Sequence, residues 1–321
     1  MKKKTALIIG ISGQDGAYLA SHLLRLGYEV HGTSRDAELS NFSSLRQLNI
    51  YEKVKVHSMS LIDFRSVMQT ILEIKPDEIY NLAGQTSVGL SFVQPVETLE
   101  SISIGTLNIL EVMRFHKLDA KFYNASSGEC YGETENLGAN EGTQFRPRSP
   151  YAVAKAAAFW QVANYREAYG IFACSGILFN HESPLRPKRF VTKKIVKTVC
   201  DIKKGTQNFL ILGNLKINRD WGYAPEYVGA MFLMLQQDKP DDFIIATGHT
   251  ISLEDFTKLA FDYLELRMDD HIVINENLMR PSDIIFSKGN PSKANKILRW
   301  KAKTNVEELV RIMIQCELGN T

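Results

Sequence analysis

The feature that most constrains the fold is a glycine pattern, Gly10-x-x-Gly13-x-x-Gly16, that separates two segments of different periodicity. Before it, Thr5–Ile9 is a continuous run of strand-forming residues, as expected for a parallel strand covered on both faces. After it, residues 17–26 carry apolar side chains at helical spacing. In this order the glycines allow a tight turn, a close approach of a pyrophosphate and close packing of helix on strand. The segment is therefore predicted to bind a dinucleotide, with the phosphates at the helix N-terminus.

The choice of dinucleotide depends on the end of the second predicted strand, residues 29–33, which meets the adenosine ribose in such folds. An acidic side chain there favours NAD, whereas an arginine accommodates the 2′-phosphate of NADP. The sequence has Arg35 followed by Asp36. Because a guanidinium pairs well with a phosphate, we expect NADP as cofactor, with NAD the less favoured alternative.

Strand and helix patterns alternate along the chain, which predicts an α/β fold with a doubly wound parallel sheet of the Rossmann type. Further strands are expected at residues 54–58, 78–82, 121–125, 172–178 and 242–246. Helices are expected at residues 64–74, 95–115, 151–169, 190–202, 226–236, 253–263 and 306–315. After residue 178 the composition changes, with a turn-rich stretch and then a basic run at residues 186–194.

A candidate catalytic pair, Tyr151 and Lys155, lies four residues apart after a favourable helix start at Pro150. The phenol and the ammonium therefore share one helix face. A neighbouring cation lowers the pKa of a tyrosine, which makes Tyr151 a candidate general base for an alcohol. The spacing alone also fits a surface tyrosine and a solvated lysine. Ser127 and Glu129 follow the preceding strand, whose carboxyl end faces the same crevice.

Composition argues against several other classes of protein. Lys plus Arg number 38 and Asp plus Glu 36, so the net charge of +2 indicates neither nucleic acid nor a membrane as partner. The four cysteines are widely spaced, and neither a disulfide framework nor a metal site is expected. The apolar run at residues 6–11 is too short for a signal peptide, and no run reaches membrane-spanning length. We therefore expect a soluble, cytoplasmic protein.

Several blocks of the sequence resemble the GDP-mannose 4,6-dehydratases, within the extended short-chain dehydrogenase/reductase superfamily. The blocks are residues 13–19, 80–83, 148–155, 176–184, 190–192, 219–222 and 241–248. The most specific are Asn-His-Glu-Ser-Pro at residues 180–184 and Arg-Asp-Trp-Gly at residues 219–222. The resemblance implies a Rossmann domain carrying NADP over residues 1–178, to which a segment near residues 220–248 returns. It also implies a smaller C-terminal α/β domain, mainly residues 179–321, that holds the GDP-sugar.

The resemblance also implies a mechanism. Tyr151, helped by Lys155, would take the proton of the sugar C4 hydroxyl while a hydride passes to the nicotinamide. Glu129 would remove the C5 proton, which the new 4-ketone acidifies. Ser127 would assist the loss of water from C6, and the hydride would then return to C6 to give a 4-keto-6-deoxy sugar.

Binding residues follow from the glycine pattern and the resemblance together. We expect the cofactor to contact Gly10, Gly13, Gln14, Asp15, Gly16, Arg35, Leu61, Leu82, Ala83, Tyr151 and Lys155. The positions that match the family's sugar-nucleotide site are Ser87, Asn180, Val191, Lys194, Arg219, Arg280 and Asp283. Arginine and lysine side chains suit a diphosphate.

The sequence departs from the family at five positions. Gly128 and Ser127 stand where a serine and a threonine are usual, Asp36 replaces a second arginine, Asp283 a glutamate, and Ser60 an acid. Alternatives therefore stay open: the same reaction on a GDP-heptose, an NADP-dependent 4-ketosugar reductase, a 4-epimerase, or a non-catalytic nucleotide-binding regulator. A reductase or epimerase needs no carboxylate at Glu129, so this residue favours dehydration.

Assembly is expected from the helices at residues 95–115 and 151–169, whose apolar residues exceed a single buried stripe. These residues are Leu99, Ile102, Leu107, Leu110, Val112, Ala156, Phe159, Trp160 and Val162. Family members pair these helices about a two-fold axis, so we expect a homodimer. The loop at residues 35–46 corresponds to the family's tetramer contact, and a homotetramer is the further expectation.

Overall fold

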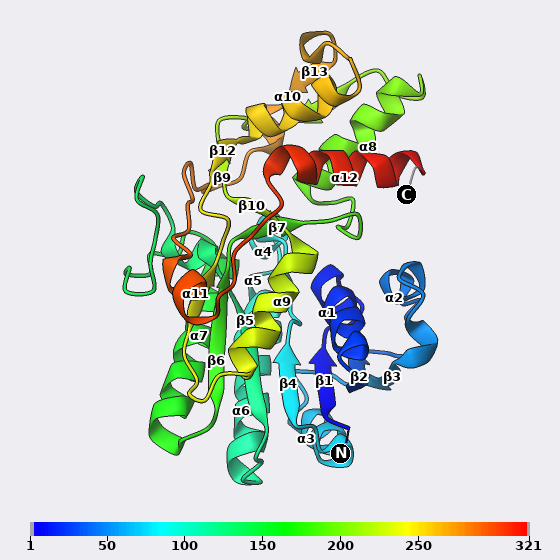
Figure 1. Ribbon diagram of the computed structural model, residues 1–321. Helices are drawn as coiled ribbons and strands as arrows, with labels where there is room; N and C mark the ends of the chain where they lie inside the picture. Colours follow the sequence, from blue (N-terminus) through cyan, green and yellow to red (C-terminus); the bar gives the residue numbers. More distant parts are fainter. Residues whose placement is uncertain (1–2, 320–321) are drawn as a thin grey trace.

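The structure, a computed structural model, describes residues 3–319 and is organised around one seven-stranded sheet (Figure 1). Its strands are β1 (Thr5–Ile9), β2 (Glu29–Ser34), β3 (Lys55–Ser58), β4 (Glu78–Asn81), β5 (Lys121–Ser127), β6 (Ala173–Leu178) and β11 (Phe243–Ile245). The order across the sheet is β11-β6-β5-β4-β1-β2-β3, and every neighbouring pair is parallel. The parallel, doubly wound α/β sheet predicted from the sequence is confirmed.

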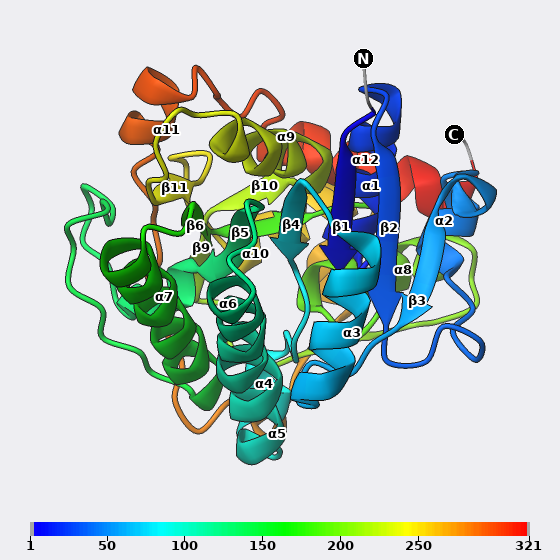
Figure 2. The same cartoon turned by 90° about the horizontal axis from the view of Figure 1, so that it is seen from below.

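Helices cover both faces of this sheet (Figure 2). One face carries α1 (Gln14–Arg25) and α9 (Ala224–Leu235), and the other carries α3 (Phe64–Ile74), α6 (Gly105–Phe115) and α7 (Pro150–Tyr169). Short elements complete this part: η1 (Tyr51–Lys53), η3 (Gly128–Tyr131), α2 (Ser43–Gln47), α4 (Val88–Ser91) and α5 (Pro95–Leu99). Covering both faces explains why strand sequences such as Thr5–Ile9 are apolar throughout rather than alternating.

Helix α7 begins and ends where its sequence predicts. The Ser149 hydroxyl accepts a hydrogen bond from the backbone N–H of Ala152 at 3.1 Å, and Pro150 occupies the first turn. Gly170 ends the helix in the left-handed region, with φ at +67°. The buried face of the helix, which includes Tyr151, Ala154 and Ala158, fixes its rotation about its axis and with it the direction of Tyr151.

The helix predicted at residues 95–115 is continuous but contains a π-helical turn. This turn, η2 (Glu100–Ile104), lies between α5 and α6. It packs against the turn that follows β4, where a Cβ on Gly84 would lie 2.7 Å from Cγ1 of Ile102. A π turn inserts one extra residue per turn and re-aims the following side chains, and such turns are frequent at functional sites.

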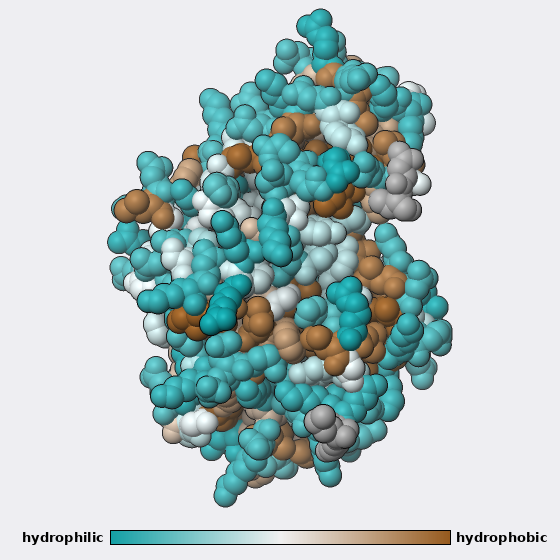
Figure 3. Space-filling view, in the orientation of Figure 1, coloured by the Kyte–Doolittle hydropathy of each residue, from teal (hydrophilic) through white to brown (hydrophobic). Residues whose placement is uncertain are grey.

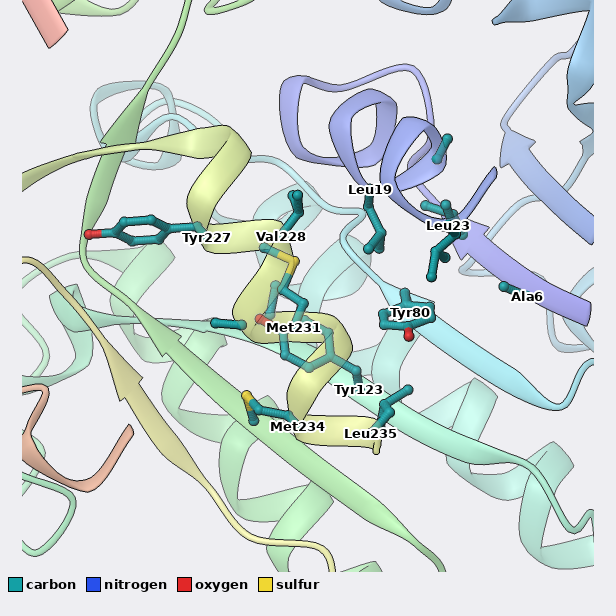
Figure 4. Packing of buried hydrophobic residues seen from close by; sticks show 14 of the residues in the cluster. Ala6, Leu19, Leu23, Tyr80, Tyr123, Tyr227, Val228, Met231, Met234 and Leu235 are labelled. Atoms are coloured by element: carbon teal, nitrogen blue, oxygen red, sulfur yellow. The ribbon is translucent and has the colours of Figure 1, made fainter. Parts of the chain in front are cut away.

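The core between the sheet and helices α1 and α9 is dense and apolar (Figure 4). Helix α9 contributes Met231 and Leu235, and α1 contributes Leu19 and Leu23, all of them buried. These side chains pack over Tyr80 and the neighbouring strands. The packing binds α9, which is remote in sequence, firmly to the first half of the chain.

The C-terminal part forms a second, smaller layer above the carboxyl ends of the strands (Figure 1). It contains α8 (Val191–Lys203), α10 (Leu253–Tyr263), α12 (Val306–Leu318), η4 (Met268–Asp270) and η5 (Glu276–Leu278). Its paired strands are β7 (Asn180–Glu182) with β10 (Trp221–Tyr223), β9 (Asn218–Arg219) with β12 (Ile251–Ser252), and β8 (Leu210–Leu212) with β13 (Ile272–Ile274). The sequence analysis missed these pairs because two- and three-residue strands are too short to carry a period.

The chain returns to the main sheet after the C-terminal layer has begun. Residues 224–245 contribute α9 and β11, and residues 292–300 make a second return that the sequence analysis did not predict. In that return α11 (Ser292–Ile297) packs against β11. The Trp300 indole lies edge-on to Tyr227 at 5.6 Å and donates a hydrogen bond to the Glu226 carbonyl at 3.0 Å. These crossings tie the two layers together around the crevice between them.

The surface seen in Figure 3 is mainly hydrophilic, with small scattered apolar patches. Within residues 3–319, no helix has both the length and the apolar character needed to cross a bilayer. Of the apolar residues expected at a subunit interface, Ile102, Leu110, Val112, Phe159 and Val162 are instead buried inside the protomer. That part of the expectation is wrong, because Ile102 packs against α7 and the others lie in clusters with strand residues of the main sheet.

Candidate active site

A pocket of about 350 Å³ lies between the carboxyl ends of the central strands and the C-terminal layer. This is where open α/β sheets bind their ligands. The predicted site residues that line it are Asp15, Leu82, Ser87, Ser127, Glu129, Tyr151, Lys155, Asn180, Val191, Lys194, Arg219, Arg280 and Asp283. The predicted residues that do not line it are Gly10, Gly13, Gln14, Gly16, Arg35, Leu61 and Ala83. All the residues expected to act in catalysis or to bind the sugar nucleotide are therefore brought together.

Ser127 and Glu129 are positioned by the end of β5. The Ser127 hydroxyl accepts a hydrogen bond from the backbone N–H of Glu129 at 3.2 Å and so begins the η3 turn. Between them, Gly128 leaves room for a neighbour: a Cβ there would lie 3.0 Å from three carbons of the Phe179 ring. The glycine that departs from the family pattern thus accommodates this aromatic ring at the wall of the pocket.

Glu129 is a largely buried carboxylate near a cation, with its Oε1 3.9 Å from Nε of Arg219. Burial raises the pKa of Glu129 above its ordinary value. Arg219 and Arg280 oppose the rise, while the negative charges of Asp283 and Glu133 add to it. A carboxylate with a raised pKa is well suited to take a proton from carbon and to give it up again.

Tyr151 and Lys155 meet in the pocket as their spacing predicted, with Nζ of Lys155 5.9 Å from the centre of the Tyr151 ring. Nζ donates a hydrogen bond to the Ala125 carbonyl at 2.7 Å, and burial lowers the pKa of Lys155 to about 8. Burial raises the pKa of Tyr151 well above its usual range, and the Ser127 hydroxyl acts in the opposite direction. The expected lowering of the tyrosine pKa is therefore wrong for the protein alone, because desolvation is the largest influence on the Tyr151 pKa and raises it.

The glycine loop has the geometry that a phosphate needs. Gly10 has a φ of +88°, and a Cβ on Gly16 would lie 2.5 Å from the Gly10 carbonyl oxygen and 2.6 Å from Cα of Ile11. Gly13 is the N-cap of α1 and leaves the first N–H groups of that helix free of side-chain caps. Free amides at a helix N-terminus attract anions, so the residues present fit a dinucleotide pyrophosphate.

A buried ion pair fixes this loop to β7. His181 Nε2 lies 2.8 Å from Oδ2 of Asp15, and its Nδ1 lies 2.7 Å from the Phe179 carbonyl oxygen, which can only accept. Burial alone would lower the pKa of His181, but Asp15 and this carbonyl raise it. Likewise, burial opposes ionisation of Asp15, yet His181 holds the Asp15 pKa below its usual value. Gln14 joins the network by donating to the His181 carbonyl at 3.2 Å and accepting from Ser183 at 2.6 Å.

Several functional candidates were not assigned by sequence reasoning. His181, Glu182, Arg186, Arg189 and Phe190 also line the pocket. The Arg186 guanidinium stacks on the Phe190 ring, 3.6 Å from its centre. These residues belong to the Asn-His-Glu-Ser-Pro block and the basic run after it. Position directly after a specific motif was the signal that separates Arg186, which is partly buried, from exposed cations of the same run such as Lys188.

The cations expected to bind the diphosphate come from the C-terminal layer. Arg219 donates to the Ile284 carbonyl at 2.7 Å and to Asp283 at 3.2 Å, and Arg280 donates to the same Asp283 oxygen at 3.3 Å. Lys194, on the first turn of α8, donates to the Ile211 carbonyl at 2.6 Å. The Ser87 hydroxyl caps α4 by accepting from the Leu90 N–H at 3.3 Å.

The predicted cofactor contacts outside the pocket lie on the side of β1 and β2. Arg35 is exposed at the end of β2, whereas Oδ1 of Asp36 accepts the backbone N–H groups of Glu38 and Leu39, both at 3.0 Å. One carboxylate oxygen of Asp36 is therefore engaged in hydrogen bonds within its own loop. Leu61 packs towards α6, and its carbonyl accepts from Asn108 at 2.7 Å. Among residues 3–319, no group of three or more His, Cys, Asp or Glu side chains has a geometry for binding a metal.

Fold and site together define an enzyme of the extended short-chain dehydrogenase/reductase class: a doubly wound sheet, a glycine loop and a Tyr–Lys pair at its carboxyl edge. Within that class, the sequence profile of the family described as GDP-mannose 4,6 dehydratase matches residues 7–313. Relatives include GDP-mannose 4,6 dehydratase 2 of Arabidopsis thaliana, 47% identical over 98% of this chain and 87% of its own. The GDP-mannose 4,6-dehydratase of Vibrio cholerae is 40% identical over 99% of this chain and 94% of its own. The chain belongs to the GDP-mannose 4,6-dehydratase family.

Solved structures agree in fold. A UDP-glucose 4-epimerase of Thermotoga maritima superposes with a TM-score of 0.85 at 22% identity, covering 97% of each chain. A dTDP-glucose 4,6-dehydratase of Bacillus anthracis gives a TM-score of 0.85 at 18% identity, covering 99% of this chain and 97% of the other. At this level of identity the likeness establishes the architecture, and the chemistry must be argued from the site.

Proposed function

We propose that this protein converts GDP-mannose to its 4-keto-6-deoxy form by internal hydride transfer from C4 to C6, with NADP as a regenerated cofactor. The observation that carries the proposal is the presence in one pocket of a Tyr–Lys pair and a second proton-transfer group, Glu129, beside Ser127. Oxidation of an alcohol needs only the pair. Elimination of water needs the additional base.

The cofactor would be held by the glycine loop at its pyrophosphate, by Lys155 and Tyr151 near its reactive ring, and by Arg35 at the 2′-phosphate. When bound, the nicotinamide supplies the reversible acceptance of a hydride. Two features support NADP over NAD: Arg35 is exposed at the strand end, and Asp36 is already engaged by two backbone N–H groups. A guanidinium free to turn towards a phosphate forms a strong charge-assisted pair.

Tyr151 would take the proton of the C4 hydroxyl as C4 is oxidised. Because burial raises the pKa of this phenol, it can act as a base only if its phenolate is stabilised. Lys155 and the Ser127 hydroxyl are the groups placed to do so. Lys155 is itself held by the Ala125 carbonyl, which fixes its distance from the ring. Its lowered pKa keeps it titratable near neutral pH.

Glu129 would then remove the C5 proton from the 4-keto sugar. The C6–O bond breaks with the hydroxyl leaving as water, for which Glu129 can return the proton it has just taken, assisted by the Ser127 hydroxyl. Hydride addition at C6 and protonation at C5 complete the conversion, and the proton that Tyr151 took from the C4 hydroxyl balances the one added at C5. The net change is the loss of one water molecule, without consumption of cofactor.

The sugar nucleotide would lie in the C-terminal layer, with its diphosphate near Arg219, Arg280 and Lys194. Asn180, Ser87, Val191 and Asp283 complete the set of proposed contacts. We assign the cofactor to the part built on the main sheet and the GDP-sugar to the smaller part above it.

A homodimer, and through the loop at residues 35–46 a homotetramer, is the proposed assembly in the cytoplasm. Support comes from the outer surface of the α5–α7 layer, where Val96, Leu99, Ile104, Val153 and Trp160 are all exposed apolar side chains. Contiguous exposed apolar residues on a soluble protein usually mark a partner surface.

The test is turnover of a panel of GDP-sugars that includes GDP-mannose and a GDP-heptose, with products identified by mass. We expect GDP-mannose to lose one water with NADP unchanged in amount, and Tyr151→Phe to abolish the reaction. Turnover of the GDP-heptose but not of GDP-mannose would make the heptose the substrate. A product that is an isomer of equal mass would indicate a 4-epimerase. Stoichiometric oxidation of NADPH would indicate a reductase, and binding without turnover a regulator.

A further inference from the structure

Four charged side chains form a chain of alternating sign along one wall of the pocket. Glu129 Oε1 lies 3.9 Å from Arg219 Nε, Arg219 Nη2 lies 3.2 Å from Asp283 Oδ1, and Asp283 Oδ1 lies 3.3 Å from Arg280 Nη1. The chain joins the η3 turn, strand β9 and the loop at residues 280–283. Its two carboxylates and two guanidiniums balance in charge.

Arg219 cannot leave this arrangement easily. Its Nη1 is held by two backbone carbonyl oxygens, of Ile284 at 2.7 Å and Asn218 at 3.0 Å, and the residue is only 4% exposed. Both carbonyls are neutral acceptors on the side remote from Glu129. The Nε and Nη2 edge, which would offer a fork to a phosphate, is therefore the edge now directed at Glu129 and Asp283. An anion that binds this edge must compete with both carboxylates for one cation.

The remaining groups that face Glu129 do not replace that cation. Glu133 adds a further negative charge, and Asp283 acts in the same sense. Tyr151 and Cys130 lie near enough to interact, and burial raises the pKa of both, which leaves them neutral at pH 7. The positive charge that stabilises the Glu129 carboxylate therefore comes from Arg219 and Arg280.

We propose that the substrate diphosphate, by pairing with Arg219 and Arg280, offsets the positive charge that these residues present to Glu129 and so makes Glu129 a stronger base when substrate is bound. The inference rests on the function proposed above and adds a coupling between the two ends of the substrate. Without nucleotide, Arg219 and Arg280 oppose the rise that burial imposes on the Glu129 pKa. With nucleotide, the phosphates neutralise the guanidiniums, and the low-dielectric wall leaves Glu129 with its raised proton affinity.

The coupling between nucleotide binding and protonation of Glu129 is reciprocal, and this makes it measurable. If the nucleotide raises the proton affinity of Glu129, then protonation of Glu129 must raise the affinity for the nucleotide by the same factor. Binding should therefore take up a fraction of a proton and become tighter as the pH falls. At the limit of one proton taken up, the affinity rises about tenfold for each pH unit.

The experiment is isothermal titration of GDP-mannose into the NADP-loaded Tyr151→Phe variant, in two buffers of different ionisation enthalpy. A sugar diphosphate is a diester, so its phosphates do not titrate near neutral pH, and the proton count belongs to the NADP-loaded enzyme, whose 2′-phosphate is the same in every variant. Tyr151→Phe keeps the substrate intact. The comparison variants add Glu129→Gln or the matched control Glu135→Gln, which changes an exposed carboxylate in the same way.

We expect proton uptake in Tyr151→Phe and in the double variant with Glu135→Gln, and none in the double variant with Glu129→Gln. Binding without proton uptake in Tyr151→Phe overturns the coupling. Uptake that survives Glu129→Gln but is lost with Asp283→Asn also overturns it, by placing the proton on Asp283. Absence of GDP-mannose binding contradicts the proposed function instead, so the two failures are distinguishable. Thermal unfolding and NADP binding show that each variant is folded.

Discussion

Alanine substitutions at two glycines of the nucleotide loop, Gly13 and Gly16, should distinguish an effect on protein stability from an effect on cofactor binding. A Cβ on Gly16 would lie 2.5 Å from the Gly10 carbonyl oxygen and 2.6 Å from Cα of Ile11, both backbone atoms that no rotamer change can move. A Cβ on Gly13 meets only the Gly10 oxygen, at 3.4 Å, and Gly13 has an extended backbone that any residue can adopt. Gly16→Ala is therefore expected to destabilise the protein, and Gly13→Ala is not.

The expected magnitude follows from opposing terms. Overpacking a tight contact costs about 3 kcal/mol at the upper end of its range, and replacing a helical glycine by alanine returns about 1 kcal/mol. Gly16→Ala should therefore lose about 2 kcal/mol of unfolding free energy. With about 2.1 cal/mol/K of unfolding entropy per residue over 321 residues, this lowers Tm by about 3 °C. For Gly13→Ala, the loss of a favourable N-cap and the gain from a stiffer unfolded chain are each about 0.5–1 kcal/mol and nearly offset.

The assays are thermal unfolding without ligand and direct titration with NADP⁺. Gly16→Ala should lose both stability and binding, because the loop and α1 are pushed apart. Gly13→Ala should unfold like the wild type yet bind NADP⁺ at least tenfold more weakly, since its methyl group faces the approaching pyrophosphate. A Gly16→Ala variant as stable as the wild type, or a Gly13→Ala variant with undiminished affinity, would refute this reasoning about the loop.

Four further outcomes are expected. Glu129→Gln should stop elimination while C4 oxidation continues, so nicotinamide absorbance should show reduced cofactor building up on the enzyme; water loss at the normal rate would exclude Glu129 as the base. Arg35→Ala should weaken NADP binding about 10- to 100-fold and leave NAD binding unchanged in titrations; an unaltered preference would place this arginine elsewhere. Burial lowers the Lys155 pKa from 10.5 to about 8, so the unfolded chain binds the extra proton between these pH values and stability should rise with pH there. Relative to Lys155→Met, denaturant titrations should show the wild type gaining about 3 kcal/mol over this range, and a pH-independent difference would contradict the shift. Finally, Trp160→Glu, at a side chain 62% exposed, should give monomers in light scattering, whereas Ile211→Glu, 42% exposed on β8, should not; dimers in both would move the interface.

Local chemistry explains how much of the fold the sequence could predict. Helices α3 and α10 begin and end at the residues expected, because their caps and apolar periodicity are signals within a few residues of one another. The π turn at Glu100–Ile104 left no such signal, since it arises where the helix fits against Gly84. The return of residues 292–300 to the main core could not be predicted from the sequence either, because Trp300 packs on residues more than seventy positions away.

The same contrast holds for the site. The i, i+4 spacing of Tyr151 and Lys155 on one helix was enough to predict that they meet, because helix geometry is fixed by the backbone. Their protonation behaviour was not, since it depends on how much water the fold removes. Lys155 lies against the Ala125 carbonyl in a buried pocket, and the phenol pKa rises instead of falling.

The class of fold, the loop proposed to bind a dinucleotide and the side chains proposed to carry the chemistry could be predicted from the amino-acid sequence, because each depends on residues close together in the chain or on a specific motif. The charges that act on Glu129 could not, because they depend on the tertiary fold. Arg219 and Asp283 reach it from segments about 90 and 150 residues further along, and their distances set its electrostatic environment. Coulomb interactions depend on separation in space and on desolvation, neither of which is written in the local sequence.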